Sequence, residues 1–334
     1  MEYVAATDKA PGMKLVRRIH NDQMEKERAV IVVHGIFSNC LKLKPLVDAM
    51  TQHAALLNCD IYAFDYDFNN AIHDNGRLLL AAIQGVQVDN DYEGWVIVGH
   101  SMGGLVARSA LLQHNNGSLP INLLIMLGSP NFGAVNPALQ AIVGSMMVSI
   151  GTGIRALFSK KQGLKDLTKI DSVFEPYIDS GGPDIYCEYI SIPGLCYHED
   201  GNGMRNPGLT GWLFKAINGA SRAIPLSIKI TRPHDGIVER RSTAFVGAAG
   251  RVTEKDGSID KLESSTYTHV EFAPECRRLH HCQLYEDKTV NQHIVEIVAF
   301  GCFNAWYIDR GAQGRRGIRC YKYSLSTTSC PESV

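Results

Sequence analysis

One stretch of the sequence, Gly99-His100-Ser101-Met102-Gly103, has the residue types and spacing of an activated nucleophile. A serine with glycines two positions before and after it can occupy a sharp turn between a strand and a helix, with its hydroxyl projecting outward. An apolar run that predicts a strand, 94–99, precedes it, and a segment that predicts a helix, 105–114, follows. This context, together with the additional Gly104, favours a nucleophilic Ser101 over a tight turn that contains a serine by chance.

A second stretch, His34-Gly35-Ile36-Phe37, follows an apolar run and supplies a feature that such a nucleophile needs. Attack of a serine on a carbonyl carbon creates an oxyanion, which backbone N–H groups can bind. We expect the N–H groups of Ile36 and Met102 to form this oxyanion hole. We interpret His34 and His100 as structural residues that hold the two turns.

Apolar runs alternate with amphipathic segments around these residues and predict a mostly parallel sheet flanked by helices. The runs that predict strands are 29–33, 59–65, 94–99, 121–127, 184–192, 226–230 and 266–272. The segments that predict helices are 43–57, 77–88, 105–114, 159–169 and 290–300. Residues 2–28 are mixed and polar, residues 251–265 predict a polar surface loop, and the arginine-containing C-terminus predicts a solvated basic tail.

The segments VVHGI, GHSMGGLVAR and LLIMLGSPNFGA together resemble the lipases and serine esterases of the α/β-hydrolase superfamily. Within it, the sequence is most similar to the branch of bacterial lipases and PGAP1-like or DUF676-like serine esterases. The resemblance is specific from Val30 to Ala134 and becomes patchy afterwards. It implies the α/β-hydrolase fold and a catalytic triad in the chain order serine, acid, histidine, so the acid and the histidine lie downstream of Ser101.

The segment 231–238 resembles the Asp-Gly-Ile-Val segment of the family, which follows a late strand. The resemblance implies that Asp235 is the acid. Its carboxylate would accept a hydrogen bond from a histidine Nδ1–H and stabilise the imidazolium that forms during attack. Since Asp-Gly alone is an ordinary turn signal, Asp184 and Asp200 remain alternatives.

Four histidines, His269, His280, His281 and His293, lie downstream of Asp235. The segment His281-Cys282-Gln283-Leu284 resembles the His-x-x-Leu loop of the family, which implies that His281 is the general base, on a loop. The family often has glycine before this histidine, where this chain has His280, so His280 remains an alternative. We expect His269, in a strand, and His293, in the last helix, to have other roles.

After the fourth strand the pattern changes, and no residue from Phe132 to Ile154 is charged. The superfamily commonly inserts a lid at this point, so we expect one domain over 1–334 with a lid or cap at 131–183 and a second, irregular insertion at 195–225. The polar residues and glycines of the uncharged segment argue against a membrane span, but the lid would permit peripheral membrane contact. We expect the substrate to contact Phe37, Leu139, Val143 and Met147.

Composition excludes several other classes of protein. With 33 Lys+Arg and 34 Asp+Glu, the net charge of −1 provides no general basic field for nucleic acid. The nine cysteines form no CxxC pair, and neither a metal nor a cofactor is expected, although Asp200–Gly203 leaves a calcium site open. The N-terminus lacks the apolar run of a signal peptide, so we expect a cytoplasmic protein, with signal-independent export as an alternative.

Together these features predict a serine hydrolase that cleaves carboxylic esters through an acyl-enzyme, with lipids or long-chain acyl esters as substrates. A lipase, an esterase and a phospholipase all fit this prediction. Two alternatives remain open from the sequence. The same triad supports an acyltransferase or a thioesterase, and the fold can serve as an interaction module without catalysis.

Overall fold

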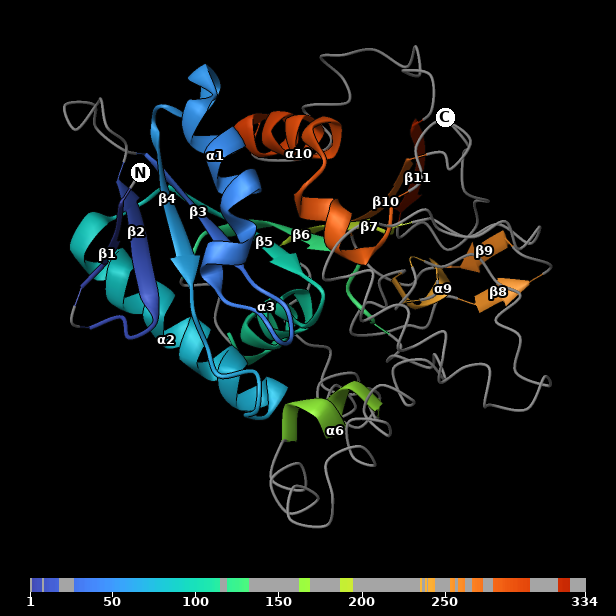
Figure 1. Cartoon of the computed structure of the whole chain (residues 1–334), viewed down its shortest axis with the longest axis horizontal. Coiled ribbons are helices and arrows are strands. Elements are labelled where there is room, and N and C mark those ends of the chain that lie inside the picture. Colours follow the sequence, from blue (N-terminus) through green and yellow to red (C-terminus); the bar gives the residue numbers. More distant parts are fainter. Residues whose placement is uncertain are drawn as a thin grey trace.

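The computed structural model describes residues 2–7, 9–17, 27–114, 119–131, 162–168, 187–194, 235, 238, 240–243, 253–255, 258–261, 266–272, 279–300 and 318–324. A 9-stranded sheet crosses this part of the chain in the order β1-β2-β4-β3-β5-β6-β7-β10-β11 (Figure 1). From β4 to β10 all neighbours are parallel, whereas β1, β2 and β11 pair antiparallel at the edges. The strands are β1 (Glu2–Ala5), β2 (Met13–Arg17), β3 (Arg28–Val33), β4 (Cys59–Phe64), β5 (Gly94–His100), β6 (Ile121–Leu127), β7 (Glu188–Ile192), β10 (Thr266–Phe272) and β11 (Ile318–Ser324).

Helices cover both faces of this sheet (Figure 1). The helices α1 (Lys44–Gln52) and α10 (Lys288–Phe300) lie on one face, and α2 (Ile72–Asn90) and α3 (Met102–Gln113) lie on the other. The shorter elements are η1 (Cys40–Leu43), η2 (Ala54–Leu56), η4 (His281–Tyr285), α6 (Gln162–Thr168), α9 (Arg240–Thr243) and the hairpin of β8 (Thr253–Lys255) and β9 (Ser258–Lys261). The molecule therefore has the α/β-hydrolase fold that the sequence predicts: a mostly parallel sheet between two layers of helices.

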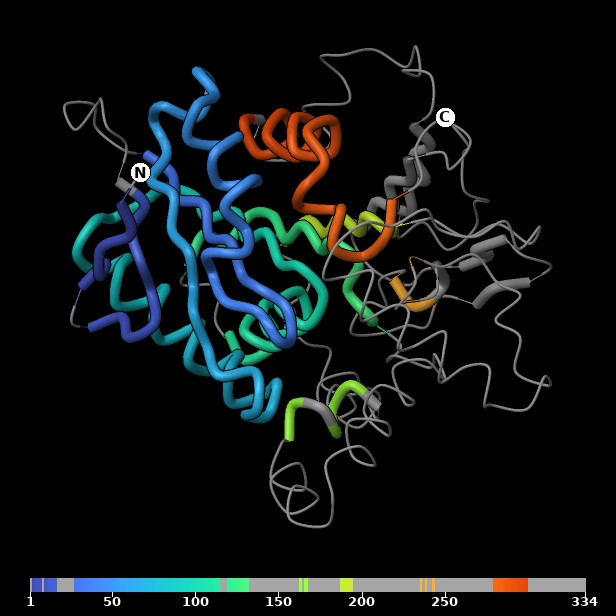
Figure 2. The backbone as a smooth tube through the Cα atoms, viewed as in Figure 1, coloured from blue at the N-terminus to red at the C-terminus, as the bar shows by residue number. Residues whose placement is uncertain are grey.

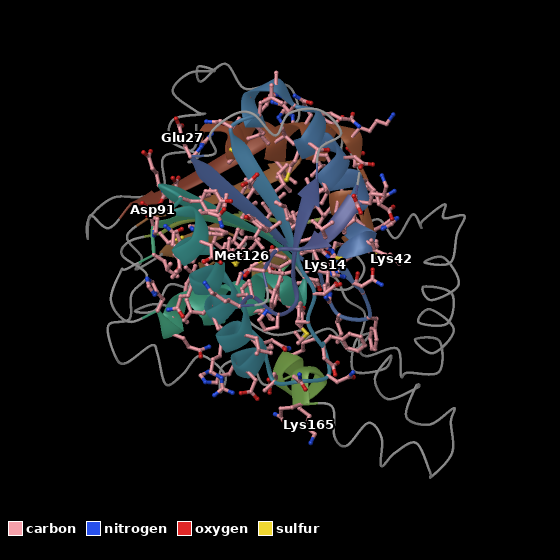
Figure 3. The ribbon with its side chains drawn as sticks, turned by 90° about the vertical axis from the view of Figure 1, so that its left-hand side faces the viewer. Lys14, Glu27, Lys42, Asp91, Met126 and Lys165 are labelled. Atoms are coloured by element: carbon pink, nitrogen blue, oxygen red, sulfur yellow. The ribbon has the colours of Figure 1, made fainter. Side chains whose placement is uncertain are left out.

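Strand β3 shows why the central strands are continuously apolar. Ile31 and Val33 pack into the hydrophobic core on the α2–α3 face, whereas Val30 and Val32 pack into the core on the α1–α10 face. Successive side chains of a strand point to opposite faces, so a strand covered on both faces must be apolar at every position. Met126 of β6 likewise lies inside the molecule (Figure 3).

The parallel arrangement gathers the carboxyl ends of the strands at one edge of the sheet. Strands β3, β5 and β6 run side by side through the middle of the molecule (Figure 2). The residues that follow their carboxyl ends are His34 after β3, Ser101 after β5 and Gly128 after β6. In open α/β sheets this edge is where ligands bind, because the loops that follow several strands meet there. The predicted nucleophile and oxyanion turns are therefore neighbours as a result of topology.

Three segments that the sequence does not identify as strands are part of the sheet or of a hairpin. Residues 2–28 contribute the edge strand β1 and its neighbour β2, the C-terminal region contributes the other edge strand, β11, and the predicted loop 251–265 contains β8 and β9. Edge strands are exposed on at least one side and do not need a continuous apolar sequence. In β11, Arg319 and Lys322 interrupt the apolar and aromatic residues, so the segment lacks the continuous apolar run by which the central strands are predicted.

Little of the two predicted insertions lies within the described residues. Of the predicted cap at 131–183, the structure describes Asn131 and α6, while the second insertion at 195–225 and the predicted strand at 226–230 lie outside the described residues. Among the described helices, none is long and apolar enough to cross a membrane.

The helix α6 is fastened to the sheet domain beside the start of α3. Asp166 accepts a hydrogen bond from the backbone N–H of Ile72, the first residue of α2, at 2.8 Å. Gly163 donates its backbone N–H to the carbonyl oxygen of Asn69 at 3.2 Å and lies so close to Met102 that a Cβ on it would be 2.8 Å from Met102 Cε. Lys165, in contrast, points away from the molecule (Figure 3). A buried carboxylate of α6 therefore caps the N-terminus of α2 from a distance of 94 positions in sequence.

This contact predicts a stability effect. Replacement of Asp166 by Ala should lower the free energy of unfolding by about 0.5–2 kcal/mol, because the buried N–H of Ile72 loses its acceptor. The matched control is Asp74→Ala, which removes an exposed carboxylate from the first turn of the same helix and its ion pair with Arg77. The control should cost about 0.5 kcal/mol or less in urea denaturation. Equal losses for the two variants would contradict the capping role.

Candidate active site

Ser101 occupies a strained turn between β5 and α3. Its backbone has φ 55° and ψ −124°, a conformation that residues with a side chain rarely adopt. The turn is held by a hydrogen bond from the N–H of Ser101 to the carbonyl oxygen of Leu127 at 2.8 Å. Glycine is required on both sides: a Cβ on Gly99 would lie 2.5 Å from Gly104 Cα, and a Cβ on Gly103 would lie 2.4 Å from the carbonyl oxygen of His34.

The loop that follows β3 lies directly against this turn. A Cβ on Gly35 would be 2.9 Å from Ser101 Cβ, so Ile36, the next residue, is adjacent to the serine. On the other side of Ser101, Met102 is buried and begins α3. The first N–H groups of a helix have no partner within the helix and carry its positive partial charge. Both predicted oxyanion residues thus lie next to Ser101, and the N–H of Met102 is at a helix N-terminus, a position suited to an anion.

His34 fastens this loop through hydrogen bonds on both ring nitrogens. Its Nδ1–H donates to the carbonyl oxygen of Gly35 at 2.8 Å, and its Nε2 accepts from the N–H of Tyr66 at 3.3 Å. The ring also stacks on Tyr66 with a centroid distance of 4.3 Å. Burial lowers the pKa of His34, which keeps the ring neutral as this hydrogen-bond pattern requires. These contacts agree with the structural role expected for His34.

Asp235 and His281 form a buried hydrogen-bonded pair. His281 Nδ1 lies 2.7 Å from Asp235 Oδ2, and both side chains are almost entirely shielded from solvent. The other carboxylate oxygen, Oδ1, accepts from the N–H of Val238 at 2.7 Å. A carboxylate held in this way orients an imidazole and stabilises its charged form. The alternative acids Asp184 and Asp200 lie outside the described residues.

The other downstream histidines have different surroundings. His280, next to His281, donates its backbone N–H to Gln283 Oε1 at 3.2 Å, and burial lowers the pKa of its ring. His293 lies in α10, with Nδ1 3.8 Å from Glu296 Oε2, and His269 lies in β10. His281 itself begins the short helix η4 instead of lying in the loop that the sequence predicts. In this 3-10 turn the His281 ring points toward Asp235, and the backbone N–H of His281 also donates to the carbonyl oxygen of Asp235.

Two glycines that the sequence does not single out enclose the Asp235–His281 pair. Gly128, with φ +58°, follows β6, and a Cβ on it would lie 3.1 Å from His281 Nδ1 and 3.2 Å from Asp235 Oδ2. Gly194 follows β7, and a Cβ on it would lie 2.6 Å from Asp235 Cβ. The sequence could have indicated both glycines, because each stands just beyond the carboxyl end of a parallel strand, where loops approach a site most closely.

Phe37 is 43% exposed and lies at the rim of the site. Its backbone also has a positive φ of 53°, and its ring meets Phe68 edge-on at a centroid distance of 5.2 Å. The other predicted substrate contacts, Leu139, Val143 and Met147, lie outside the described residues, as does the Asp200–Gly203 segment. Among the residues that the structure does describe, no group of three His, Cys, Asp or Glu side chains is arranged to hold a metal.

The close packing around the acid predicts that Gly194 tolerates no side chain. Gly194→Ala should lower the free energy of unfolding by about 1–3 kcal/mol, because its methyl group meets both Asp235 Cβ and the carbonyl oxygen of Leu279. The downfield proton NMR signal of the His281–Asp235 hydrogen bond should shift or disappear.

Gly94→Ala provides the matched control. A Cβ at Gly94 would meet only the end of the exposed Asn122 side chain, at 3.0 Å, which can move aside. We expect it to cost less than about 1 kcal/mol and to leave the NMR signal in place. An unchanged signal in Gly194→Ala would show that this packing does not position the acid.

Comparison with known proteins identifies the fold. Residues 25–173, somewhat less than half of the chain, match the family model of the PGAP1-like alpha/beta domain. No curated protein sequence is significantly similar to this chain. The mature form of the lipase BlEst2 from Bacillus licheniformis has a TM-score of 0.54 and 15% identity, and the match covers 86% of this chain and 96% of the lipase.

Two further solved structures are similar to this chain. The propeptide form of the same lipase has a TM-score of 0.54 and 15% identity, with 86% of this chain and 53% of that chain covered. A protein from Listeria innocua has a TM-score of 0.48 and 13% identity, with 82% and 94% covered. At these identities the likeness concerns the fold, which is lipase- and esterase-like. The mostly parallel sheet, the strained Ser101 turn at the end of β5 and the match to the PGAP1-like domain together give this chain the fold of the α/β-hydrolase superfamily.

Proposed function

We propose that the protein is a serine hydrolase that cleaves carboxylic esters, with Ser101, Asp235 and His281 as its catalytic triad. The observation that carries the proposal is the 2.7 Å hydrogen bond between His281 Nδ1 and Asp235 Oδ2. This pair lies beside the strained Ser101 turn, since His100, the residue before the serine, hydrogen-bonds to the backbone of His281. A strained serine, a histidine and a buried carboxylate are the groups that nucleophilic acyl transfer requires.

In the first half of the proposed reaction, His281 Nε2 takes the proton of the Ser101 hydroxyl while Oγ attacks the ester carbonyl carbon. The carbonyl oxygen becomes an oxyanion, which the backbone N–H groups of Ile36 and Met102 bind. Asp235 stabilises the imidazolium of His281 without taking its proton. When the C–O bond of the ester breaks, His281 gives the proton to the departing alcohol, and the acyl group stays on Ser101.

In the second half, a water molecule replaces the alcohol. His281 takes a proton from the water, whose oxygen attacks the acyl carbon, and the same N–H groups bind the second oxyanion. The bond to Ser101 Oγ then breaks, the serine recovers its proton from His281, and a carboxylic acid leaves. Every step uses groups of the chain and water.

Lipids or other long-chain acyl esters are the substrates that we propose. The rim of the site supports this class, because Phe37 is a large apolar side chain with 43% of its surface exposed. Leu41, four residues further along the chain, is also a large apolar side chain and is 58% exposed. Phe68 extends this apolar surface beside Phe37. The name of the structurally similar Bacillus licheniformis protein, a lipase, points to the same class. Leu139, Val143 and Met147 of the predicted cap would add to the apolar wall, and the cap would contact a lipid surface.

The nucleophile assignment predicts the loss of both hydrolysis and covalent labelling in one variant. Ser101→Ala should lower the turnover of short- and long-chain nitrophenyl esters by a factor of about 10³ or more. It should also abolish labelling by a fluorophosphonate probe, which reacts with activated serines. Urea denaturation should show a folded protein. A Ser101→Ala variant that is labelled or hydrolyses esters at the wild-type rate would disprove the assignment.

The two adjacent histidines predict unequal effects. His281→Ala should reduce kcat by about 10³–10⁶-fold, because His281 is the group that Asp235 aligns to take the serine proton. His280→Ala serves as the neighbouring control and should reduce kcat less than about tenfold. Steady-state kinetics on one nitrophenyl ester distinguishes the two. A larger loss in His280→Ala would assign the base to His280 instead.

A further inference from the structure

The backbone of His281 is held on both sides. Its N–H donates to the carbonyl oxygen of Asp235 at 3.0 Å, and its carbonyl oxygen accepts a hydrogen bond from His100 Nε2 at 3.1 Å. The first contact fixes His281 relative to the acid. The second fixes it relative to His100, which is the last residue of β5 and directly precedes Ser101.

The hydrogen bond determines the state of the His100 ring. A carbonyl oxygen can only accept, so Nε2 must carry the hydrogen. Burial keeps the pKa of His100 well below its ordinary value, and the neighbouring His281 lowers it further. His100 therefore stays neutral when His281 becomes positively charged, and it adds no second cation to the site.

Packing leaves the His100 ring little freedom. Its centroid lies 4.7 Å from that of His281, at an interplanar angle of 51°, and 4.7 Å from that of Tyr285, which it meets edge-on at 78°. Both partners belong to η4. On the other side, a Cβ on Gly35 would lie 3.0 Å from His100 Nδ1. The His100 ring thus fills the space between η4 and the loop that follows β3.

We propose that His100 is a positioning residue that sets the separation between the Ser101 turn and the His281 ring. One end of His100 is part of the strand that carries the nucleophile, and its Nε2 holds the backbone of the general base. The proposal rests on the proposed function, because it assigns to His100 the alignment of that triad. Misplacement of a catalytic group by about 1 Å can cost a factor of 10² in rate.

Three variants of His100 test this role. His100→Phe keeps a flat ring but removes the donor, His100→Gln places an amide N–H near the position of Nε2, and His100→Asn has an amide that is too short to reach the carbonyl oxygen of His281. We expect kcat to fall about 10–100-fold in the Phe and Asn variants, with KM changed less than about twofold. The Gln variant should recover kcat at least about fivefold over Asn.

The matched control is His114→Phe. His114 is also buried and accepts a hydrogen bond from the N–H of Leu119 at 3.0 Å, but it lies at the far end of α3, about 18 Å along the helix from Met102. Loss of this histidine should lower stability in urea denaturation and leave kcat unchanged. A loss of kcat that accompanies only the His100 variants supports positioning over general stability.

The outcomes separate this inference from the proposed function. If the wild-type protein neither hydrolyses nitrophenyl esters nor reacts with the fluorophosphonate probe, the proposed function fails and the inference fails with it. If the wild type is active and His100→Phe retains its kcat, the inference alone is wrong. Should the Phe variant not fold, the comparison of Gln with Asn decides, and equal kcat values for these two overturn the proposal.

Discussion

The hydrogen bond from His281 Nδ1 to Asp235 Oδ2 joins residues 46 positions apart, and the arrangement of the site depends on it. A buried carboxylate is costly unless its oxygens are occupied, and here one oxygen binds the imidazole and the other binds the N–H of Val238. The surrounding chain must approach within contact distance of this pair, which explains glycine at positions 128 and 194. The hydrogen bond that pairs Oδ2 of Asp235 is therefore the same one that aligns the His281 ring.

The sheet supplies the rigidity that this requirement needs. Strands β3, β5 and β6 are buried on both faces, and a residue of the site follows the carboxyl end of each: His34, Ser101 and Gly128. A backbone strain such as that of Ser101 persists only where surrounding structure fixes it. The hydrogen bond from Ser101 N–H to Leu127 and the close contacts of Gly99 and Gly103 provide this support. The strained Ser101 turn thus lies in a closely packed part of the molecule.

The sequence predicts the central strands and the nucleophile turn well because their causes are local. Continuous apolar runs and fixed glycine spacing act within a few residues, so β3, β5 and β6 and the Ser101 turn are found where expected. The antiparallel strands β1, β2 and β11 are joined to the parallel part of the sheet by pairing with strands that lie far away in the sequence, as β2 with β4 and β11 with β10, and they leave a weaker pattern. Some contacts depend on the tertiary fold and leave no pattern in the sequence. Examples are the hydrogen bond from the N–H of Ile72 to Asp166 and the one from His100 Nε2 to the carbonyl oxygen of His281.

The anchoring of α6 makes two segments that lie far apart in sequence depend on one another. Asp166 of α6 accepts from the N–H of Ile72, and Gly163 donates to the carbonyl oxygen of Asn69, so α6 and the start of α2 are joined by two hydrogen bonds. If α6 opened, the first turn of α2 would lose the carboxylate that caps it. The two segments therefore form one cooperative unit, although 94 positions separate Ile72 from Asp166.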